Sequence, residues 1–491
     1  MSRMMSLAGK VGAVVPVTRV DQSALDRLVM QLKQSKDRPF CGDLGAFERE
    51  LKERLTAVGR EAVADELRKA DIDASAVQVG STGYRRLQRE QETYMTTFGP
   101  VTVERTLYRD RSDPGERALA VLEPRAGIIG GFWTPEAAKQ GIWVVAQMTP
   151  GMSEELFERV GTMKPSKSSL DRLPKEISRT WEEDRKAFER ELRATLVVPE
   201  QAATVAVSLD GVLVPMKSVE GATDGQLEER RTKEGKLAGG PAGYREVGCA
   251  TLTFYDEAGD MLSAVRLARM PQEKKVDLKE MLKAELAIVR EQRPDLVVVK
   301  VADACKDNWT FLGREIRGGK EAIDYYHATE HLSDALQAAY GKGTGEQRRR
   351  YAELADVLLN EPDGADRVVA ALRYQRRLHP KNRILKREAK FFTANKERMR
   401  YAALRAEFLP VGSGPMEAAC KTLATQRMKQ SGMQWGEAGG QAILTPRAWS
   451  QSDRFDKAWA LVAATYQLEV TLLSKVVDLG TYKKSRQTPS A

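Results

Sequence analysis

Three acidic residues, far apart in the sequence, are candidates for binding metal ions. Asp210 interrupts an apolar run, Asp303 directly follows the apolar run 295–302, and Glu417 lies in the first turn of a predicted helix. Carboxylate oxygens are the ligands that hard divalent cations such as Mg²⁺ prefer. If the three side chains meet in the folded chain, they form a metal site.

Each acid also has a simpler explanation. The pair Asp210-Gly211 between apolar segments is a strong signal for a hairpin turn. Asp303 is placed to cap a helix, and Glu417 would stabilise the positive end of its own helix, which Ser413 can cap. That helix has a predicted apolar face, next to which Glu417 is expected to point inward; the face is formed by Met416, Cys420 and Leu423. The second position of the set is also open, because other acids lie within reach of it in the sequence, namely Asp256, Asp260 and Asp307.

Three converging carboxylates would suit the chemistry of phosphodiester bonds. Two divalent ions roughly 3.5–4 Å apart can stabilise both the attacking and the leaving oxygen of a displacement at phosphorus. Asp210 would bridge both ions, Asp303 would hold one and Glu417 the other. The expected cofactor is therefore two Mg²⁺ or Mn²⁺ ions. Such a displacement would need no covalent enzyme intermediate.

A basic segment supports nucleic acid as the partner. Residues 373–405 contain twelve Lys or Arg and two acids, a net charge of +10, whereas the whole chain carries +9. Phosphate contacts dominate nucleic-acid affinity and make it depend steeply on salt. The alternative is a solvated helix face. With residues from the Glu417 helix, the predicted DNA contacts are Arg376, Arg377, Lys386, Arg387, Lys390, Arg398, Arg400, Lys421, Arg427 and Lys429.

Two further features could contact DNA. Three short helices are predicted between Thr134 and about residue 186, the third capped by Ser168, with Lys164, Lys167 and Arg172 near its head. This pattern resembles a helix-turn-helix, although an ordinary three-helix packing unit would look the same. Trp309 and Trp435 could stack on unpaired bases, but such residues more often belong to the core.

Composition and hydrophobic periodicity set the frame for these residues. The 491-residue chain is 42% hydrophobic and 30% charged, and its four cysteines form no C-x-x-C pair. No signal peptide or membrane-spanning run is apparent, so a cytoplasmic location is expected. Residues 93–111 alternate on both sides of Gly99-Pro100, which predicts a hairpin. From residue 204, strands followed by helix, strand and helices predict a mixed sheet covered by helices.

Four stretches carry a resemblance to a known family. These are GFWTPEAA (131–138), SLDG (208–211), DYYHATEHL (324–332) and, most specifically, the block 395–435. They resemble the ISKra-type bacterial insertion-sequence transposases, distant relatives of the Mutator-like transposases, over roughly residues 90–460. The resemblance implies a ribonuclease H-like α/β domain with an all-helical insertion and an Asp-Asp-Glu triad at Asp210, Asp303 and Glu417. It also implies supporting roles for Asp324 and His327, the Asp-x-x-His element.

The resemblance further implies a domain order and an activity. The enzyme would bind the terminal inverted repeats of its element as double-stranded DNA, cut them and join the 3′ ends to target DNA. It would work as a homodimer or larger assembly at the bacterial nucleoid. The expected order is a tail (1–20), a helical region suited to oligomerisation (21–90), a DNA-binding region with the hairpin (91–200), the first catalytic part (201–327), the basic helical insertion (328–405), the remaining catalytic part (406–475) and a tail (476–491).

Two other functions remain open at this stage. A catalytically inactive or domesticated descendant would keep the DNA-binding parts alone. Residues 327–331 also spell H-x-x-E-H, the inverted zinc-peptidase motif, in which two histidines bind zinc and the glutamate acts as base. A peptidase needs a third ligand, and the one remaining histidine, His379, lies in the basic segment.

Overall fold

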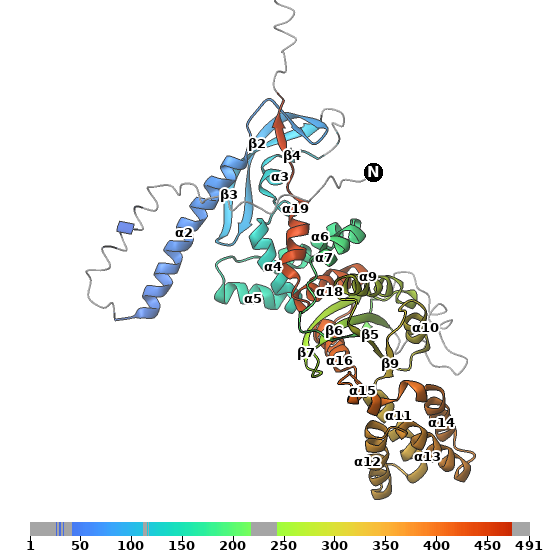
Figure 1. The fold of residues 1–491 in the computed structure, drawn as a ribbon. Helices are drawn as coiled ribbons and strands as arrows, with labels where there is room; N and C mark the ends of the chain where they lie inside the picture. The colour runs from blue at the N-terminus through green and yellow to red at the C-terminus, as the bar shows by residue number, and fades with distance from the viewer. Residues whose placement is uncertain are drawn as a thin grey trace, which may run out of the picture. The chain divides into compact units, whose positions relative to one another are not determined.

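The computed structural model describes residues 42–110, 117–217 and 243–473, with Gly115 and four residues between 26 and 33 (Figure 1). The chain divides into two compact units. The first unit comprises residues 1–145, 150–173 and 460–491, and the second comprises 146–149 and 174–459. Both predicted tails, and most of residues 21–41 of the predicted helical region, lie outside the described residues.

The first unit is built on a five-stranded antiparallel sheet with the order β10-β1-β2-β3-β4. Its elements and those that enter it are α2 (Leu44–Ala70), β1 (Ala76–Val79), β2 (Thr82–Thr96), β3 (Gly99–Asp110), β4 (Leu119–Ala120), α3 (Leu122–Ala126), α4 (Pro135–Gln147), α5 (Pro150–Val160), the start of α6 (Lys167–Glu183), the end of α19 (Phe455–Ala464) and β10 (Val470–Leu472).

The predicted hairpin around Gly99 is present as β2 and β3, which pair from Thr96↔Gly99 outward. The hairpin is longer than expected, because β2 already begins at Thr82. The prediction of a helical region as far as residue 90 is therefore wrong beyond Ala70, where α2 ends. Asp71 stops that helix in extended backbone, and its carboxylate instead accepts hydrogen bonds from the backbone N–H and hydroxyl of Thr106.

The three predicted short helices correspond to α4, α5 and α6. Pro135 occupies the first position of α4, where its missing N–H costs nothing. The third helix starts at Lys167, and the Ser166 hydroxyl accepts the backbone N–H of Ser169. Ser166, and not the expected Ser168, therefore caps it.

The second unit combines a mixed sheet with helices. Its elements are the rest of α6, α7 (Arg185–Ala194), β5 (Thr204–Pro215), β6 (Tyr244–Tyr255), β7 (Met261–Arg269), η1 (Glu273–Lys275), α9 (Val276–Gln292), β8 (Val297–Ala302), α10 (Lys306–Arg314), β9 (Lys320–Ile323), α11 (Tyr325–Tyr340), α12 (Gly345–Asn360), α13 (Gly364–Leu378), α14 (Arg383–Asn395), η2 (Lys396–Arg398), α15 (Tyr401–Ala406), α16 (Gly414–Ala419), η3 (Cys420–Thr425), α17 (Gln426–Met428), α18 (Glu437–Gln451) and the start of α19.

The sheet of the second unit has the order β7-β6-β5-β8-β9. β5, β6 and β7 form an antiparallel meander, whereas β8 and β9 run parallel to β5. The parallel strands are reached through α9 and α10, as a parallel connection requires a crossover. The predicted mixed sheet covered by helices is thus confirmed.

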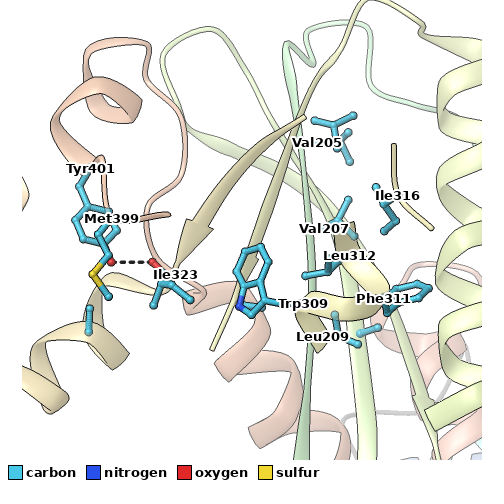
Figure 2. Close-up of a cluster of buried hydrophobic side chains, with 14 of the residues drawn as sticks. Val205, Val207, Leu209, Trp309, Phe311, Leu312, Ile316, Ile323, Met399 and Tyr401 are labelled. Atoms are coloured by element: carbon cyan, nitrogen blue, oxygen red, sulfur yellow. Dashed lines mark hydrogen bonds between the residues drawn. The ribbon is translucent and has the colours of Figure 1, made fainter. Parts of the chain in front are cut away.

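Alternating residues of β5 face opposite layers of helices. Val205, Val207 and Leu209 join the cluster formed with α9 and α10, and Figure 2 shows them opposite Leu312 and Trp309. Val214, on the other face, packs with residues of α16, η3 and α18. Since side chains alternate along a strand, Asp210 lies on the face of Val214.

The helical insertion between β9 and α16 packs mainly on itself. α11 contacts α12 and α14, and α13 contacts both α12 and α14, which closes a four-helix arrangement (Figure 1). Its two ends meet, because the backbone N–H of Tyr325 donates to the carbonyl of Val411 at 3.0 Å. A long insertion can therefore be accommodated without separating the elements on either side of it.

Among the residues the structure describes, no helix combines the length and the apolar character needed to cross a membrane.

Candidate active site

The sheet register places Asp210 and Asp303 side by side. β5 and β8 are parallel neighbours, with Val207 opposite Lys300. The same register continued by three residues brings Asp210 opposite Asp303. Paired residues on neighbouring parallel strands, about 4.8 Å apart, point to the same face of the sheet. The two carboxylates therefore share one face, although 93 residues separate them in the chain.

Asp210 does not end its strand, and it does not form a turn. β5 continues to Pro215 and pairs with β6, with Asp210 opposite Cys249. The hairpin turn predicted from the Asp210-Gly211 pair is therefore wrong. The reason is that the two neighbours of β5 differ in length: β8 stops at Ala302, whereas β6 continues. Asp210 thus lies inside β5 but beside the end of β8. Its side chain can therefore contribute to a site at the end of β8.

Asp303 follows β8 directly, as predicted, and is held by three hydrogen bonds. Its Oδ1 accepts the backbone N–H of Cys305 and the Nδ2 of Asn308, both at 3.1 Å. Its backbone carbonyl accepts the indole N–H of Trp309 at 2.6 Å. Asn308 is buried and also donates to the carbonyl of Leu209 at 3.4 Å, which joins β5 to the end of β8. Oδ2 of Asp303 accepts no hydrogen bond from the described part of the chain.

Asp303 does not cap α10, since the N-cap position of that helix is Cys305 and carries no side-chain cap. The other acids that sequence left open are placed elsewhere. Asp307 pairs with Lys279, and Asp256 accepts the backbone N–H groups of Ala258 and Asp260 in the turn between β6 and β7. Of the four candidates for the second acid, only Asp303 occupies the register position opposite Asp210.

Asp210 is half-buried beside a second negative charge. Its Oδ1 accepts the Gly211 N–H at 2.7 Å, and its Oδ2 lies 4.0 Å from the Cys420 sulfur. Burial raises the pKa of Asp210, and the Asp303 carboxylate raises it further, against the opposing effects of the Gly211 N–H and Lys275. A cation between the two aspartates would relieve this unfavourable arrangement.

Glu417 lies on a helix that covers the same face of the sheet. α16 packs against β5 and β6 through Met416 and Ala419, and Cys420, one turn after Glu417, contacts Asp210. The apolar face predicted for this helix is present, but the Glu417 side chain is exposed and does not point inward as expected. Within the described ranges, no group of three His, Cys, Asp or Glu side chains lies close enough to hold a metal ion.

The helix after Glu417 contains a π-helical segment, η3, that the sequence did not reveal. Its wider turn leaves carbonyls without their α-helical partners. The buried Arg447 side chain of α18 donates to two of them, Thr422 and Leu423, and also to Ala146. Burial lowers the pKa of Arg447 to about 10. Arg447 therefore supports the segment that joins Glu417 to the core.

Asp324 connects the strand of one acid to the helix of another. Its backbone N–H donates to Ala302 at 2.9 Å, one residue before Asp303. Its Oδ1 accepts the N–H of His327 at 2.8 Å and caps α11, and its Oδ2 accepts both the N–H and the hydroxyl of Ser413. Ser413 is the N-cap residue of α16. Asp324, only 6% exposed, is thus a positioning residue.

The histidines of H-x-x-E-H face each other on α11. The Nε2 atoms of His327 and His331 lie 3.2 Å apart, and Nδ1 of His331 lies 2.6 Å from the buried Glu388. Glu330 is exposed, and His379 lies at the end of α13. Because the described residues include no group of three ligands, the structure offers no support for a zinc peptidase.

The basic insertion residues fall into two sets. Seven are exposed and form no ion pair with any described residue, and we call them the basic tip: Arg373, Arg376, Arg377, Lys381, Arg383, Lys386 and Lys390. They lie on the second half of α13, on α14 and on the turn between these helices.

The other predicted insertion contacts are engaged within the protein. Arg387 pairs with Glu388, Arg398 pairs with Glu321, and Arg400 pairs with Asp366. Residues 373–405 form one basic segment in the sequence, but in the structure these three arginines are paired with acids. The basic tip retains charge without an intramolecular partner among the residues described.

The basic residues of the Glu417 helix also divide by burial. Lys421 and Lys429 are exposed, but Arg427 is 2% exposed and its guanidinium lies 5.4 Å from the Trp435 ring centre. A buried Arg427 is not available to DNA in this structure, so that prediction is wrong here. Charge alone could not distinguish it from its exposed neighbours.

Trp309 is not free to stack on a base, whereas Trp435 is half-buried. Trp309 belongs to the core cluster in Figure 2 and is covered by the Arg398 guanidinium at 4.2 Å. Trp435 donates its indole N–H to Met428. The ordinary core interpretation holds for Trp309.

In the first unit, the predicted DNA contacts Lys164, Lys167 and Arg172 are all exposed.

Comparison with known proteins leaves the chain without an assigned family. No family model and no curated protein matches it. Among solved structures, it is similar to the Drosophila P element transposase strand transfer complex, with 11% identity, a TM-score of 0.26, and coverage of 72% of this chain and 86% of that chain. A similarity of this size assigns neither a family nor a role to any residue.

Proposed function

We propose that this protein is a DNA transposase of the ISKra type, which cuts the ends of its element and joins them to target DNA. The observation that carries the proposal is that the register of β5 and β8, continued beyond their last pair, sets Asp210 beside Asp303, under the helix that bears Glu417. Two carboxylates at such a position suit metal-assisted displacement at phosphorus better than a structural role, because burying two like charges together is unfavourable.

The donor set fits a hard divalent cation. Asp210 and Asp303 each have one oxygen held by N–H donors and a second oxygen that accepts no N–H from the described residues, so each can bind an ion without losing its support. Asp210 and Asp303 would hold Mg²⁺ or Mn²⁺, with Glu417 as the third ligand of a two-ion site. When bound, such ions stabilise the charge that develops on the attacked phosphate.

The protein groups around the acids serve to orient them. Asn308 and Gly211 fix the direction of the two aspartates, and Asp324 ties the end of β8 to the start of α16. The Cys420 contact keeps the Glu417 helix against Asp210. Preorganised carboxylates of this kind avoid reorganisation when the ions bind.

The arrangement of strands supports a ribonuclease H-like assignment for the second unit. An antiparallel meander, β5 to β7, precedes two strands parallel to β5, and the first two acids lie on the central pair of this sheet. The helices of the insertion separate β9 from the Glu417 helix. This is the order that the sequence resemblance implies.

The basic surfaces and α2 provide the remaining functions of a transposase. We assign DNA binding to the basic tip and to Lys164, Lys167 and Arg172, and assembly into a dimer or larger complex to α2. The first half of α2 exposes apolar side chains, among them Leu44, Phe47 and Leu55. Such a stripe on a helix is typical of a surface that another helix covers.

Cleavage of the gene's own flanking DNA tests the proposal. Purified protein with Mg²⁺ should nick a duplex that contains the inverted repeat next to the gene, and the product should carry a free 3′-hydroxyl. Asp210→Asn and Asp303→Asn should abolish nicking while DNA binding persists. Full cleavage by either variant, or flanking DNA without inverted repeats, would overturn the assignment.

A second candidate, a DNA-binding descendant without catalysis, has one observation in its favour. Glu417 is exposed and does not complete a three-ligand group within the part of the chain described. If the wild-type protein binds the repeat but never cuts it with Mg²⁺ or Mn²⁺, the second function holds. If Glu417→Gln alone stops cutting, the first function holds.

A further inference from the structure

The cleavage reaction as proposed places neither the ions nor the phosphate on the histidine pair of α11. His327 and His331 are separated by four residues, so both side chains project from one side of the helix. Their Nε2 atoms are 3.2 Å apart. His331 also stacks on Phe391 of α14, with ring centres 3.8 Å apart, which fixes the plane of its ring.

The buried Glu388 determines which nitrogen of His331 is available. The His331 Nδ1 is 2.6 Å from Glu388 Oε2, and Arg387 also contacts this carboxylate. Paired with Arg387, the Glu388 carboxylate can accept the Nδ1–H of His331. In neutral His331 the Nε2 lone pair is then directed away from Glu388 and toward His327.

The hydrogen of an N–H···N bond from His327 to His331 can occupy the space between these two nitrogens. A transition-metal ion fits the same space: two nitrogens, each roughly 2.0–2.1 Å from a tetrahedral zinc ion, lie about 3.3 Å from each other. The carboxylate–histidine arrangement of Glu388 and His331 is also the usual support of a metal-binding histidine.

We propose that His327 and His331 form a binding site for a transition-metal ion of the Zn²⁺, Co²⁺ or Ni²⁺ class, separate from the carboxylate site. Imidazole is a preferred ligand of these ions. The two side chains are 34% and 26% exposed, so the ion can enter and water can complete its coordination. Binding replaces the N–H···N hydrogen bond, with the His327 hydrogen moving from Nε2 to Nδ1, and it links α11 to α14 through Glu388. With two protein ligands, the site is neither a structural zinc site nor a peptidase centre.

The site has a mechanical consequence for the insertion. The bound ion holds the first turn of α11, which begins immediately after Asp324. It therefore stiffens the base of the insertion, where the chain leaves the sheet. Binding to the folded state alone raises the unfolding temperature, because the unfolded chain does not hold the two nitrogens together.

Zinc titration of the full-length chain tests this proposal. The protein is prepared without a histidine tag and in an Asp210→Asn/Asp303→Asn background, so that the carboxylate site does not contribute. ZnCl₂ is then titrated calorimetrically, and thermal unfolding is followed in parallel. The expected result is one equivalent of zinc and a rise in unfolding temperature of about 5 °C when zinc exceeds its dissociation constant 100-fold.

Three substitutions decide the outcome. His327→Gln, which leaves the His331–Glu388 contact in place, should weaken zinc binding at least tenfold, and His331→Gln should do the same. His379→Gln, at the end of α13, is the matched control and should bind like the parent. Absence of a zinc-dependent shift in the parent, or unchanged affinity in His327→Gln, would overturn the proposal without affecting the cleavage assay.

Discussion

Replacing Asp324 by Asn tests how the two halves of the proposed site are held together. The carboxylate accepts hydrogen bonds at both oxygens: one from His327 at the start of α11 and two from Ser413 at the start of α16. Asn has nearly the same size and is an equally good N-cap residue. The substitution therefore removes one specific connection and leaves the volume and the helix cap intact.

The expected loss in the free energy of unfolding follows from the hydrogen-bonding groups that the substitution leaves without a partner. The side-chain carbonyl oxygen of the introduced asparagine can still accept the N–H of His327, but its amide NH₂ then faces the backbone N–H of Ser413. The Ser413 hydroxyl can rotate and accept from that amide, so only the bond from the backbone N–H is lost. A hydrogen bond to a charged group contributes about 1.5–3 kcal/mol, and we therefore expect a loss of about 2–3 kcal/mol in the free energy of unfolding.

Two measurements separate a positioning role from a merely structural one. Urea unfolding gives the free energy, and hydrogen exchange at the amides of residues 413–420 shows whether α16 becomes loose. If Asp324 positions Glu417, Asp324→Asn should require more Mg²⁺ for half-maximal DNA cleavage while its affinity for the repeat is unchanged. Ser413→Ala is the milder control, since it keeps the backbone N–H, and should cost about 1 kcal/mol.

The reasoning is refuted by a specific result. If Asp324→Asn unfolds within about 0.5 kcal/mol of the wild type and residues 413–420 exchange at the wild-type rate, the carboxylate does not hold α16.

Three other substitutions test the remaining features. Asp210→Asn should make the protein more stable to heat at pH 7. The pKa of Asp210 is raised in the folded state, so the folded chain holds this proton more tightly than the unfolded chain does. Wild-type stability should therefore fall as the pH rises from the ordinary pKa of 3.8 through the raised folded value, and the variant should lack this fall. Gln in place of Arg376, Arg377, Lys386 and Lys390 should reduce the slope of log affinity against log salt by about 3–4, as measured by fluorescence anisotropy. Lys396 and Arg400, which are paired with acids, are the control positions. An equal reduction of the slope on replacing these two residues would contradict the assignment. Arg447→Met should cost about 2–4 kcal/mol in urea unfolding, because buried carbonyls of η3 lose their donor; a neutral result would show that the π-helical segment needs no such support.

The parts of the site that follow from local pattern were predictable. The continuous apolar run before Asp303 is typical of a strand buried on both faces, and β8 ends where that run ends. The apolar spacing of Met416, Cys420 and Leu423 correctly predicted a helix face packed on the core. These signals depend only on neighbours along the chain.

The parts that failed depend on contacts between distant segments. Whether Asp210-Gly211 forms a turn or continues a strand is decided by β6, which supplies pairing partners far beyond the end of β8. Arg427 looks like a surface charge in sequence, but its burial follows from the way Trp435 packs over it. The hydrogen bonds that Asn308 and Asp324 make with other segments have no sequence signal beyond the residue types themselves.

The position of the insertion also has a consequence for the order in which the protein folds. The sheet from β5 to β9 is complete in the chain at residue 323, but α16 begins only at residue 414. During synthesis at about 5–20 residues per second, the ribosome therefore needs about 5–18 s to make the intervening segment. Throughout that interval the two aspartates can already be paired while the glutamate has not been synthesised. The nascent chain reaches its full set of carboxylates only after the basic helices that separate them.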